Sequence, residues 1–74
     1  MLIEVYSRKG CEYCVKAKKL LKNRNLPYTE YLVGEDLTIA ETKSLFPGVT
    51  ILPIIKVDGK YIGGFQQLLL ILNK

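Results

Sequence analysis

The chain has 74 residues, 49% of them apolar and 24% charged, which predicts one folded domain spanning residues 1–74 and excludes a disordered or multidomain protein. The longest apolar run, Leu68 to Leu72, is too short to cross a bilayer, and the first residues lack the features of a secretory signal, so we expect a cytoplasmic protein with no membrane partner. The net charge of +4 is not accompanied by a nucleic-acid recognition motif, so no nucleic-acid partner is expected. Two cysteines and no histidine are too few ligands for a structural zinc site, so no metal is expected.

The first half of the chain predicts a strand, a helix and a second strand. Leu2 to Tyr6 is almost continuously apolar, as in a central strand that is covered on both faces. Cys11 to about Asn25 has a helical pattern that ends before Pro27. The residues expected on the inner face of this helix are Tyr13, Cys14, Ala17, Leu20 and Leu21. Tyr28 to Val33 alternates and is rich in strand-forming residues.

The second half predicts a short helix, a hairpin and a closing helix. Thr38-Ile39-Ala40-Glu41 has the spacing of a capping box and begins a helix that runs to about Phe46. Asp58-Gly59 lies between two apolar runs, which is a strong signal for a two-residue hairpin turn. The two strands of the hairpin and the closing helix are expected at Ile54 to Val57, Lys60 to Ile62 and Phe65 to Leu72.

The order of these elements, β-α-β-α-β-β-α, predicts an α/β fold. A right-handed crossover makes the first two strands parallel, and the hairpin adds an antiparallel pair. The expected result is a four-stranded mixed sheet with helices on both faces. Ligands of such sheets bind at the carboxyl end of a strand, where the turn before Cys11 lies.

Cys11 and Cys14 are the residues with the clearest chemistry. Two cysteines separated by two residues, near a β-α-β pattern, are typical of a dithiol/disulfide redox centre. Cys11 is the predicted nucleophile because it lies at the helix start, and Cys14, one turn further inside, is the predicted resolving residue. Backbone N–H groups and the cations Arg8 and Lys9 favour a thiolate at Cys11, whereas the Glu12 carboxylate disfavours it.

The chain resembles glutaredoxin, the smallest version of the thioredoxin fold, over essentially its whole length. Three segments carry the resemblance: Tyr6-Ser7-Arg8-Lys9-Gly10-Cys11-Glu12-Tyr13-Cys14, Phe46-Pro47-Gly48-Val49 with Leu52-Pro53, and Val57-Asp58-Gly59-Lys60-Tyr61-Ile62-Gly63-Gly64. The family usually has proline where this chain has Glu12, and Thr-Val where it has Ile51-Leu52. The resemblance implies a thioredoxin-like fold and thiol–disulfide exchange.

The resemblance also implies a site for glutathione and for peptide substrates. The equivalent of Pro53 is cis in the family and faces the dithiol, which leaves the backbone of Leu52 free to pair with a substrate as an added strand. Arg8 takes the position of a lysine that meets the glycyl carboxylate, and Tyr13 would flank the ligand. The residues expected at the γ-glutamyl end are Gly64, Phe65 and Gln66, where the family typically has Cys or Ser followed by Asp after the two glycines.

The function implied is that of a monomeric dithiol oxidoreductase. It would reduce glutathione mixed disulfides or disulfide-containing proteins such as ribonucleotide reductase, and glutathione would re-reduce it. An alternative is a redoxin that takes electrons from thioredoxin reductase, since Gly64-Phe65 and the lack of a proline between the cysteines also resemble that group. Another class is a dimeric carrier that shares an iron–sulfur cluster through Cys11 and glutathione. A pure interaction module would tolerate serine at Cys11.

Overall fold

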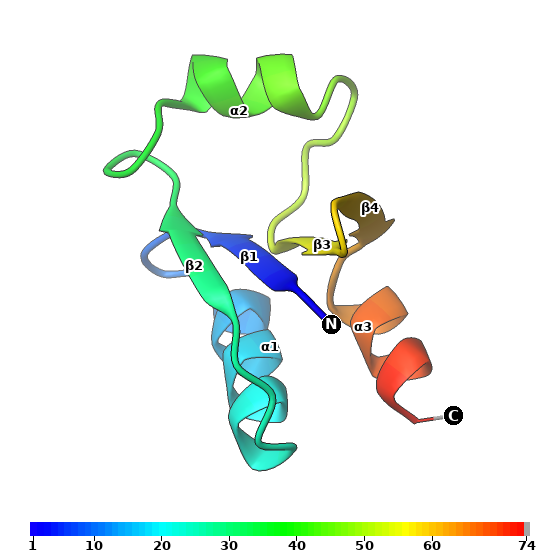
Figure 1. The fold of residues 1–74 in the computed structure, drawn as a ribbon. Coiled ribbons are helices and arrows are strands. Elements are labelled where there is room, and N and C mark those ends of the chain that lie inside the picture. Colours follow the sequence, from blue (N-terminus) through cyan, green and yellow to red (C-terminus); the bar gives the residue numbers. More distant parts are fainter. Residues whose placement is uncertain (74) are drawn as a thin grey trace.

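The computed structural model describes residues 1–73 and contains four strands and three helices in the predicted order (Figure 1). The elements are β1 (Ile3–Ser7), α1 (Glu12–Asn23), β2 (Thr29–Leu32), α2 (Ile39–Leu45), β3 (Ile54–Val57), β4 (Lys60–Gly63) and α3 (Phe65–Leu72). Each bound lies within two residues of its prediction. Within residues 1–73, no helix is both long enough and apolar enough to span a membrane.

The four strands form one mixed sheet in the order β2-β1-β3-β4. Strand β1 runs parallel to β2 and antiparallel to β3, and β4 completes an antiparallel hairpin with β3. In the central strand, Val5 pairs with Glu30 on one side and with Ile55 on the other. The near-continuous apolar character of β1 is explained by this central position, which leaves both of its faces covered.

Helices α1 and α3 cover one face of the sheet and enclose the main core (Figure 1). Alternate residues of a strand face the same side, so the inward side chains of β1 meet the buried stripe of α1. The fully buried members of this core are Ile3, Val5, Ala17, Leu21, Ile55 and Leu68. The core thereby fixes α1 against β1, and with it the turn between them that carries Cys11.

Helix α2 lies on the opposite face and stands apart from the sheet (Figure 1). Its N-terminus has the predicted capping box, because Glu41 N–H donates to Thr38 Oγ1 at 3.0 Å and Thr38 N–H donates to Glu41 Oε1 at 2.9 Å. Its C-terminus is fastened by Phe46, whose ring centroid lies 4.9 Å from that of Tyr6 in an edge-to-face arrangement. Helices therefore cover both faces, as expected, although the second face is covered more loosely.

The β3–β4 hairpin turns at the predicted dipeptide. Asp58 and Gly59 have φ values of 51° and 83°, and positive φ at both central residues is the requirement of a type I′ turn, which matches the twist of the strands. Asp58 also holds the start of β1, because Leu2 N–H donates to Asp58 Oδ1 at 2.7 Å and Asp58 N–H donates to the Leu2 carbonyl at 2.8 Å. The hairpin is thus tied to the central strand beyond the sheet pairing itself.

A polar cluster at the edge of the sheet makes stability depend on pH. The Lys18 ammonium at 2.7 Å and the Ser7 hydroxyl at 2.5 Å hold the pKa of Glu30 below its ordinary value of 4.5, because both bind the charged carboxylate. This contribution is present above pH 4.5 and is lost as the pH falls through the lowered pKa of the folded state. Glu30→Gln should therefore lower the free energy of unfolding at pH 7 by about 0.5 kcal/mol, the scale of a solvent-screened ion pair.

The measurement is urea unfolding, followed by circular dichroism, at pH values between 7 and 3. The stability of the Glu30→Gln variant should fall less steeply below pH 5 than that of the unsubstituted chain, since the variant has no carboxylate to protonate there. Glu35→Gln is a suitable control, because the pair between Glu35 and Lys9 is well exposed and contributes little. An acid slope that is identical in the Glu30→Gln variant would refute the assignment.

Candidate active site

The two cysteines lie at the junction between β1 and α1. Cys11 is the N-cap of α1, with extended backbone angles of φ −93° and ψ 108°, and Cys14 lies in the first turn. The two residues form a disulfide with Cα atoms 5.2 Å apart. Cys14 is 1% exposed, whereas Cys11 is partly exposed. The more accessible sulfur is thus at the helix start, and the buried one lies one turn further in, as the sequence predicted.

The surroundings of Cys11 favour negative charge on its sulfur. The backbone N–H of Cys14 donates to Cys11 Sγ at 3.2 Å, and the remaining free N–H groups of the first turn add the positive end of the helix dipole. Within residues 1–73 the guanidinium of Arg8 has no carboxylate partner, so its charge is available nearby. Lys9 pairs with Glu35 at 2.8 Å, which compensates part of the charge that it was expected to contribute.

Leu52 and Pro53 face the cysteines from the other side. Their peptide bond is cis, as the resemblance implied, and the Leu52 carbonyl oxygen lies 3.7 Å from Cys11 Sγ. Among the described residues, the Leu52 amide N–H has no hydrogen-bond partner. A free backbone amide beside the exposed sulfur is an edge at which an extended peptide can pair.

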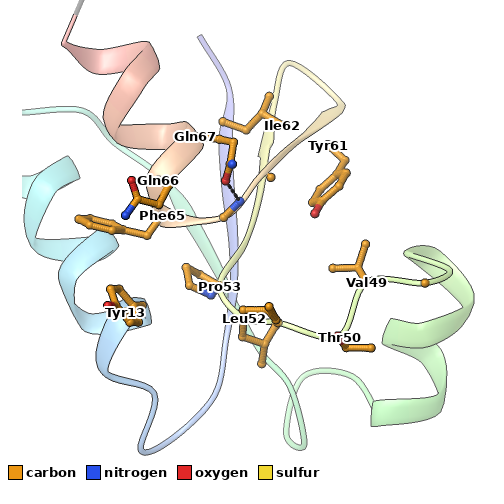
Figure 2. A pocket seen from close by; sticks show the side chains of 14 residues that line it. Tyr13, Val49, Thr50, Leu52, Pro53, Tyr61, Ile62, Phe65, Gln66 and Gln67 are labelled. Atoms are coloured by element: carbon orange, nitrogen blue, oxygen red, sulfur yellow. Dashed lines mark hydrogen bonds between the residues drawn. The ribbon is translucent and has the colours of Figure 1, made fainter.

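A groove with a volume of about 630 Å³ opens on one side of Leu52; we call it the aromatic groove (Figure 2). It is lined by Tyr13, residues 48–53 and residues 61–67. Six predicted site residues therefore meet in it: Tyr13, Leu52, Pro53, Gly64, Phe65 and Gln66. Its volume lies within the range of small-molecule sites.

Tyr13 corrects one prediction from the sequence. The helical pattern placed it on the inner face of α1, but its side chain is 51% exposed. The first turn of α1 begins at the end of the sheet, where the ring faces the groove and not the core. It lies 5.9 Å from the ring of Phe65, and the Lys16 ammonium lies 4.8 Å from its centroid. Tyr13 thus forms a wall of the groove.

A second groove lies on the other side of Leu52; we call it the α2 groove. It has a volume of about 530 Å³. It is lined by Arg8, Cys11, Val33, Ile39, Thr42, Lys43, residues 49–52 and Ile54. Arg8, the remaining predicted binding residue, lies here beside the exposed cysteine. Lys43 was not predicted as a site residue, because its position on a short polar helix gave no signal of a ligand.

Gln67 is a second groove residue that sequence reasoning missed. Its side-chain Oε1 accepts a hydrogen bond from Gly64 N–H at 2.8 Å (Figure 2). The side chain also crosses the space beside Gly63, where an added Cβ would lie 2.6 Å from Gln67 Cγ, and the φ of Gly63 is 122°. The three-residue spacing of Gly64 and Gln67 is that of a capping box, so this contact could have been found from the sequence.

The arrangement supports exchange chemistry at sulfur. It combines an accessible sulfur held by a backbone N–H, a second sulfur within bonding reach and a free peptide edge. Within residues 1–73, no three side chains of His, Cys, Asp or Glu gather in a way that could hold a metal ion.

Comparison with known proteins places these features in a family. The family model described as glutaredoxin matches residues 3–62. Glutaredoxin 3 of Escherichia coli strain K12 is 30% identical over 89% of this chain and 80% of its own length. The hybrid peroxiredoxin hyPrx5 of Haemophilus influenzae is 36% identical over 89% of this chain, which spans 27% of that protein.

Solved structures agree with the sequence comparisons. Glutaredoxin 1 of Francisella tularensis, in complex with cacodylate, superposes with a TM-score of 0.77 at 28% identity over 99% of this chain and 98% of its own. NrdH-redoxin of E. coli, a glutaredoxin-like protein, has a TM-score of 0.77 over 100% of this chain and 96% of its own, and at 21% identity it shows the fold alone. The fold is thioredoxin-like, as predicted, and the chain belongs to the glutaredoxin family of thiol–disulfide oxidoreductases.

Proposed function

We propose that the chain reduces disulfides of proteins and mixed disulfides of glutathione by exchange at Cys11 and Cys14, and that glutathione re-reduces it. The observation that carries this proposal is the hydrogen bond from Cys14 N–H to Cys11 Sγ at 3.2 Å, because it stabilises a thiolate at the accessible sulfur. The Leu52 carbonyl, 3.7 Å from the same sulfur, marks the edge along which a substrate chain would lie.

The proposed reaction transfers two electrons and two protons to the substrate. The Cys11 thiolate attacks one sulfur of the substrate disulfide, forms a mixed disulfide and releases the other substrate sulfur as a thiolate that takes up a proton. The deprotonated sulfur of Cys14 then attacks Cys11 Sγ, which forms the Cys11–Cys14 disulfide and releases the second substrate thiol. Two molecules of glutathione return the dithiol and leave as glutathione disulfide. The disulfide in the structure corresponds to the oxidised state of this cycle.

The two grooves suggest how glutathione is held. In the α2 groove, Arg8 would meet the glycyl carboxylate, and the Leu52 backbone would pair with the cysteinyl residue. In the aromatic groove, Tyr13 would flank the ligand, and Gly64, Phe65 and Gln66 would face the γ-glutamyl group. Gln66 can accept a hydrogen bond from the γ-glutamyl ammonium but cannot pair with its charge.

Two classes of protein substrate are candidates. The similarity to a hybrid peroxiredoxin supports a peroxiredoxin disulfide as one substrate. Ribonucleotide reductase, suggested by the family resemblance, is the other. We further propose that the chain acts as a monomer of one domain in the cytoplasm, without nucleic acid or metal, because the chemistry needs only its own two thiols and a reducing compartment.

A second candidate function keeps the exchange and changes the reductant. The uncharged Gln66 and the aromatic Phe65 line the groove where glutathione would need a carboxylate, which favours reduction by thioredoxin reductase. The neighbouring NrdH-redoxin, whose structure is described as the basis of a thioredoxin-like activity profile, shares the fold with this chain.

A coupled assay distinguishes the two reductants. Reduction of bis(2-hydroxyethyl) disulfide is followed by the oxidation of NADPH in two mixtures, one with glutathione and glutathione reductase, the other with thioredoxin reductase alone. Turnover in the first mixture only supports glutathione, and turnover in the second only supports the alternative. Turnover in neither, by a chain whose two thiols titrate as free, would contradict the proposed function.

A further inference from the structure

We propose that the aromatic groove binds an uncharged apolar side chain of a polypeptide substrate, next to the cysteine under attack, in preference to the γ-glutamyl group of glutathione. The proposal rests on the proposed function and specifies its substrate class: protein disulfides with an apolar flank before glutathione disulfides. Four properties of the groove support the proposal: its lack of charged lining residues, a backbone N–H that already has a hydrogen-bond partner, its apolar surface and its closeness to Cys11.

The first property is the absence of charge. None of the residues that line the aromatic groove, all of them within residues 1–73, is Asp, Glu, Lys or Arg, and the Lys16 ammonium near the Tyr13 ring lies outside this lining. The γ-glutamyl group of glutathione carries one ammonium and one carboxylate. An ammonium that enters a groove without a carboxylate loses hydration and gains no ion pair, which is unfavourable. The Gln66 side-chain oxygen can accept a hydrogen bond from the ammonium, but the uncharged amide cannot form an ion pair with it.

The second property is that one polar group of the groove is already satisfied. At the N-terminus of α3, the N–H of the N-cap residue Gly64 donates to Gln67 Oε1 at 2.8 Å. A ligand carboxylate would have to displace the Gln67 side chain to reach this amide. Displacement exchanges one hydrogen bond for another, so the net gain for an anion is reduced.

The third property is the apolar surface that remains. Figure 2 shows the rings of Tyr13 and Phe65 at one end of the groove and the ring of Tyr61 at the other, with Pro53 and Leu52 between them. Tyr13 is 51% exposed and Tyr61 is 48% exposed, so both present ring surface that a ligand can cover. Such a surface binds a leucine or phenylalanine side chain through the area that it removes from water.

The fourth property is continuity with the reactive sulfur. Leu52 lines both grooves, and its carbonyl oxygen lies 3.7 Å from Cys11 Sγ. A peptide that pairs with Leu52 as an added strand directs successive side chains to alternate sides. When its cysteine faces Cys11, the side chain of a flanking residue therefore reaches a groove beside Leu52. This geometry favours binding, in the aromatic groove, of the side chain of a residue that flanks the substrate cysteine.

The test compares substrates that differ only in the flanking residue. The substrates are symmetric disulfides of capped four-residue peptides that have Leu, Phe, Ser or Lys next to the cysteine. One series places this residue before the cysteine and a second series places it after. Each peptide disulfide, and oxidised glutathione, is mixed with the reduced protein. Rate constants are measured by acid quenching and chromatography in 0.5 M salt, where the net charge of the protein is screened. We expect Leu and Phe peptides to react about five- to tenfold faster than the Ser peptide. This factor corresponds to the free energy gained when one such side chain is partly buried.

A variant tests the role of charge in the groove. Gln66→Asp adds a carboxylate and should raise the rate with oxidised glutathione, relative to the Leu peptide, by about 1.5- to fivefold, the factor for one partly screened ion pair. Lys60→Gln makes the same change in net charge at an exposed position that lines neither groove, and its ratio should not change. Tyr61→Ala should reduce the preference for Leu over Ser.

The outcomes separate this inference from the proposed function. Equal rates for all four peptides, or oxidised glutathione as the fastest substrate of the unsubstituted chain, would overturn the inference and leave the exchange reaction standing. The absence of reaction with every disulfide would overturn both. The peptide series uses only the unsubstituted chain, so it tests the inference even if the Gln66→Asp or Tyr61→Ala variant fails to fold.

Discussion

Replacing Cys11 by serine is expected to lower the rate of disulfide reduction by about a thousandfold or more, the scale of losing a catalytic nucleophile. A serine hydroxyl does not ionise at neutral pH, so the N–H of Cys14 that points at Cys11 Sγ has no anion to stabilise. Cys14 cannot take over the attack, because its side chain is buried under the first turn of α1. The residual rate should equal that of the uncatalysed reaction.

Cys14→Ser is the matched control for this experiment. It keeps the thiolate at Cys11 and removes the resolving thiol, so the mixed disulfide between Cys11 and the substrate should accumulate. Mass spectrometry after acid quenching measures the trapped species, and alkylation by iodoacetamide at pH 7 measures the nucleophile. If Cys14→Ser were inert and Cys11→Ser trapped the substrate, the roles assigned to the two cysteines would be reversed.

The second large effect concerns stability. Leu68→Ala should lower the free energy of unfolding by about 2–5 kcal/mol, since Leu68 is 0% exposed and lies in the core between α1, α3 and the sheet. Small domains have total stabilities of about 5–15 kcal/mol, and this chain is at the small end of the range. We therefore expect a substantial unfolded fraction of the variant at 37 °C.

Leu70→Ala provides the control within the same helix. Leu70 is 68% exposed, so the same change of side chain leaves no cavity and should alter the free energy of unfolding by about 0.5 kcal/mol or less. Both variants are compared by urea unfolding, followed by circular dichroism. Equal losses at the two positions would mean that α3 does not pack on the sheet as described.

The elements of the fold could be predicted closely because their signals are local. The capping box at Thr38 and Glu41, the Asp58-Gly59 turn and the apolar run of β1 each determine a short stretch of chain by hydrogen bonding or burial. The parallel pairing of β1 and β2 followed from the handedness of crossovers. The sparse packing of α2 on the sheet could not be predicted, because it depends on where the ring of Phe46 lies in the folded protein.

The placement of the two cysteines was predicted from the sequence, whereas the shape of the candidate site was predicted less well. The positions of Cys11 and Cys14 follow from strand and helix ends, and the structure confirms that arrangement. Tyr13 was misplaced because helical periodicity does not reveal where the sheet beneath the helix ends. Each groove gathers side chains from three or more separate segments, so the contribution of Lys43 needed coordinates, whereas the Gly64–Gln67 contact could have been found from its three-residue spacing.

The loose attachment of α2 has a consequence for the range of substrates. The helix forms one wall of the α2 groove, and the residues that flank it, Leu37 and Phe46, pack into the apolar cluster with Tyr6 and Ile54. Because α2 makes few contacts with the sheet, we expect this wall to open at a lower free-energy cost than the core between α1 and β1. Such an opening would widen the α2 groove for a large protein substrate without moving Cys11, which lies at the junction of β1 and α1.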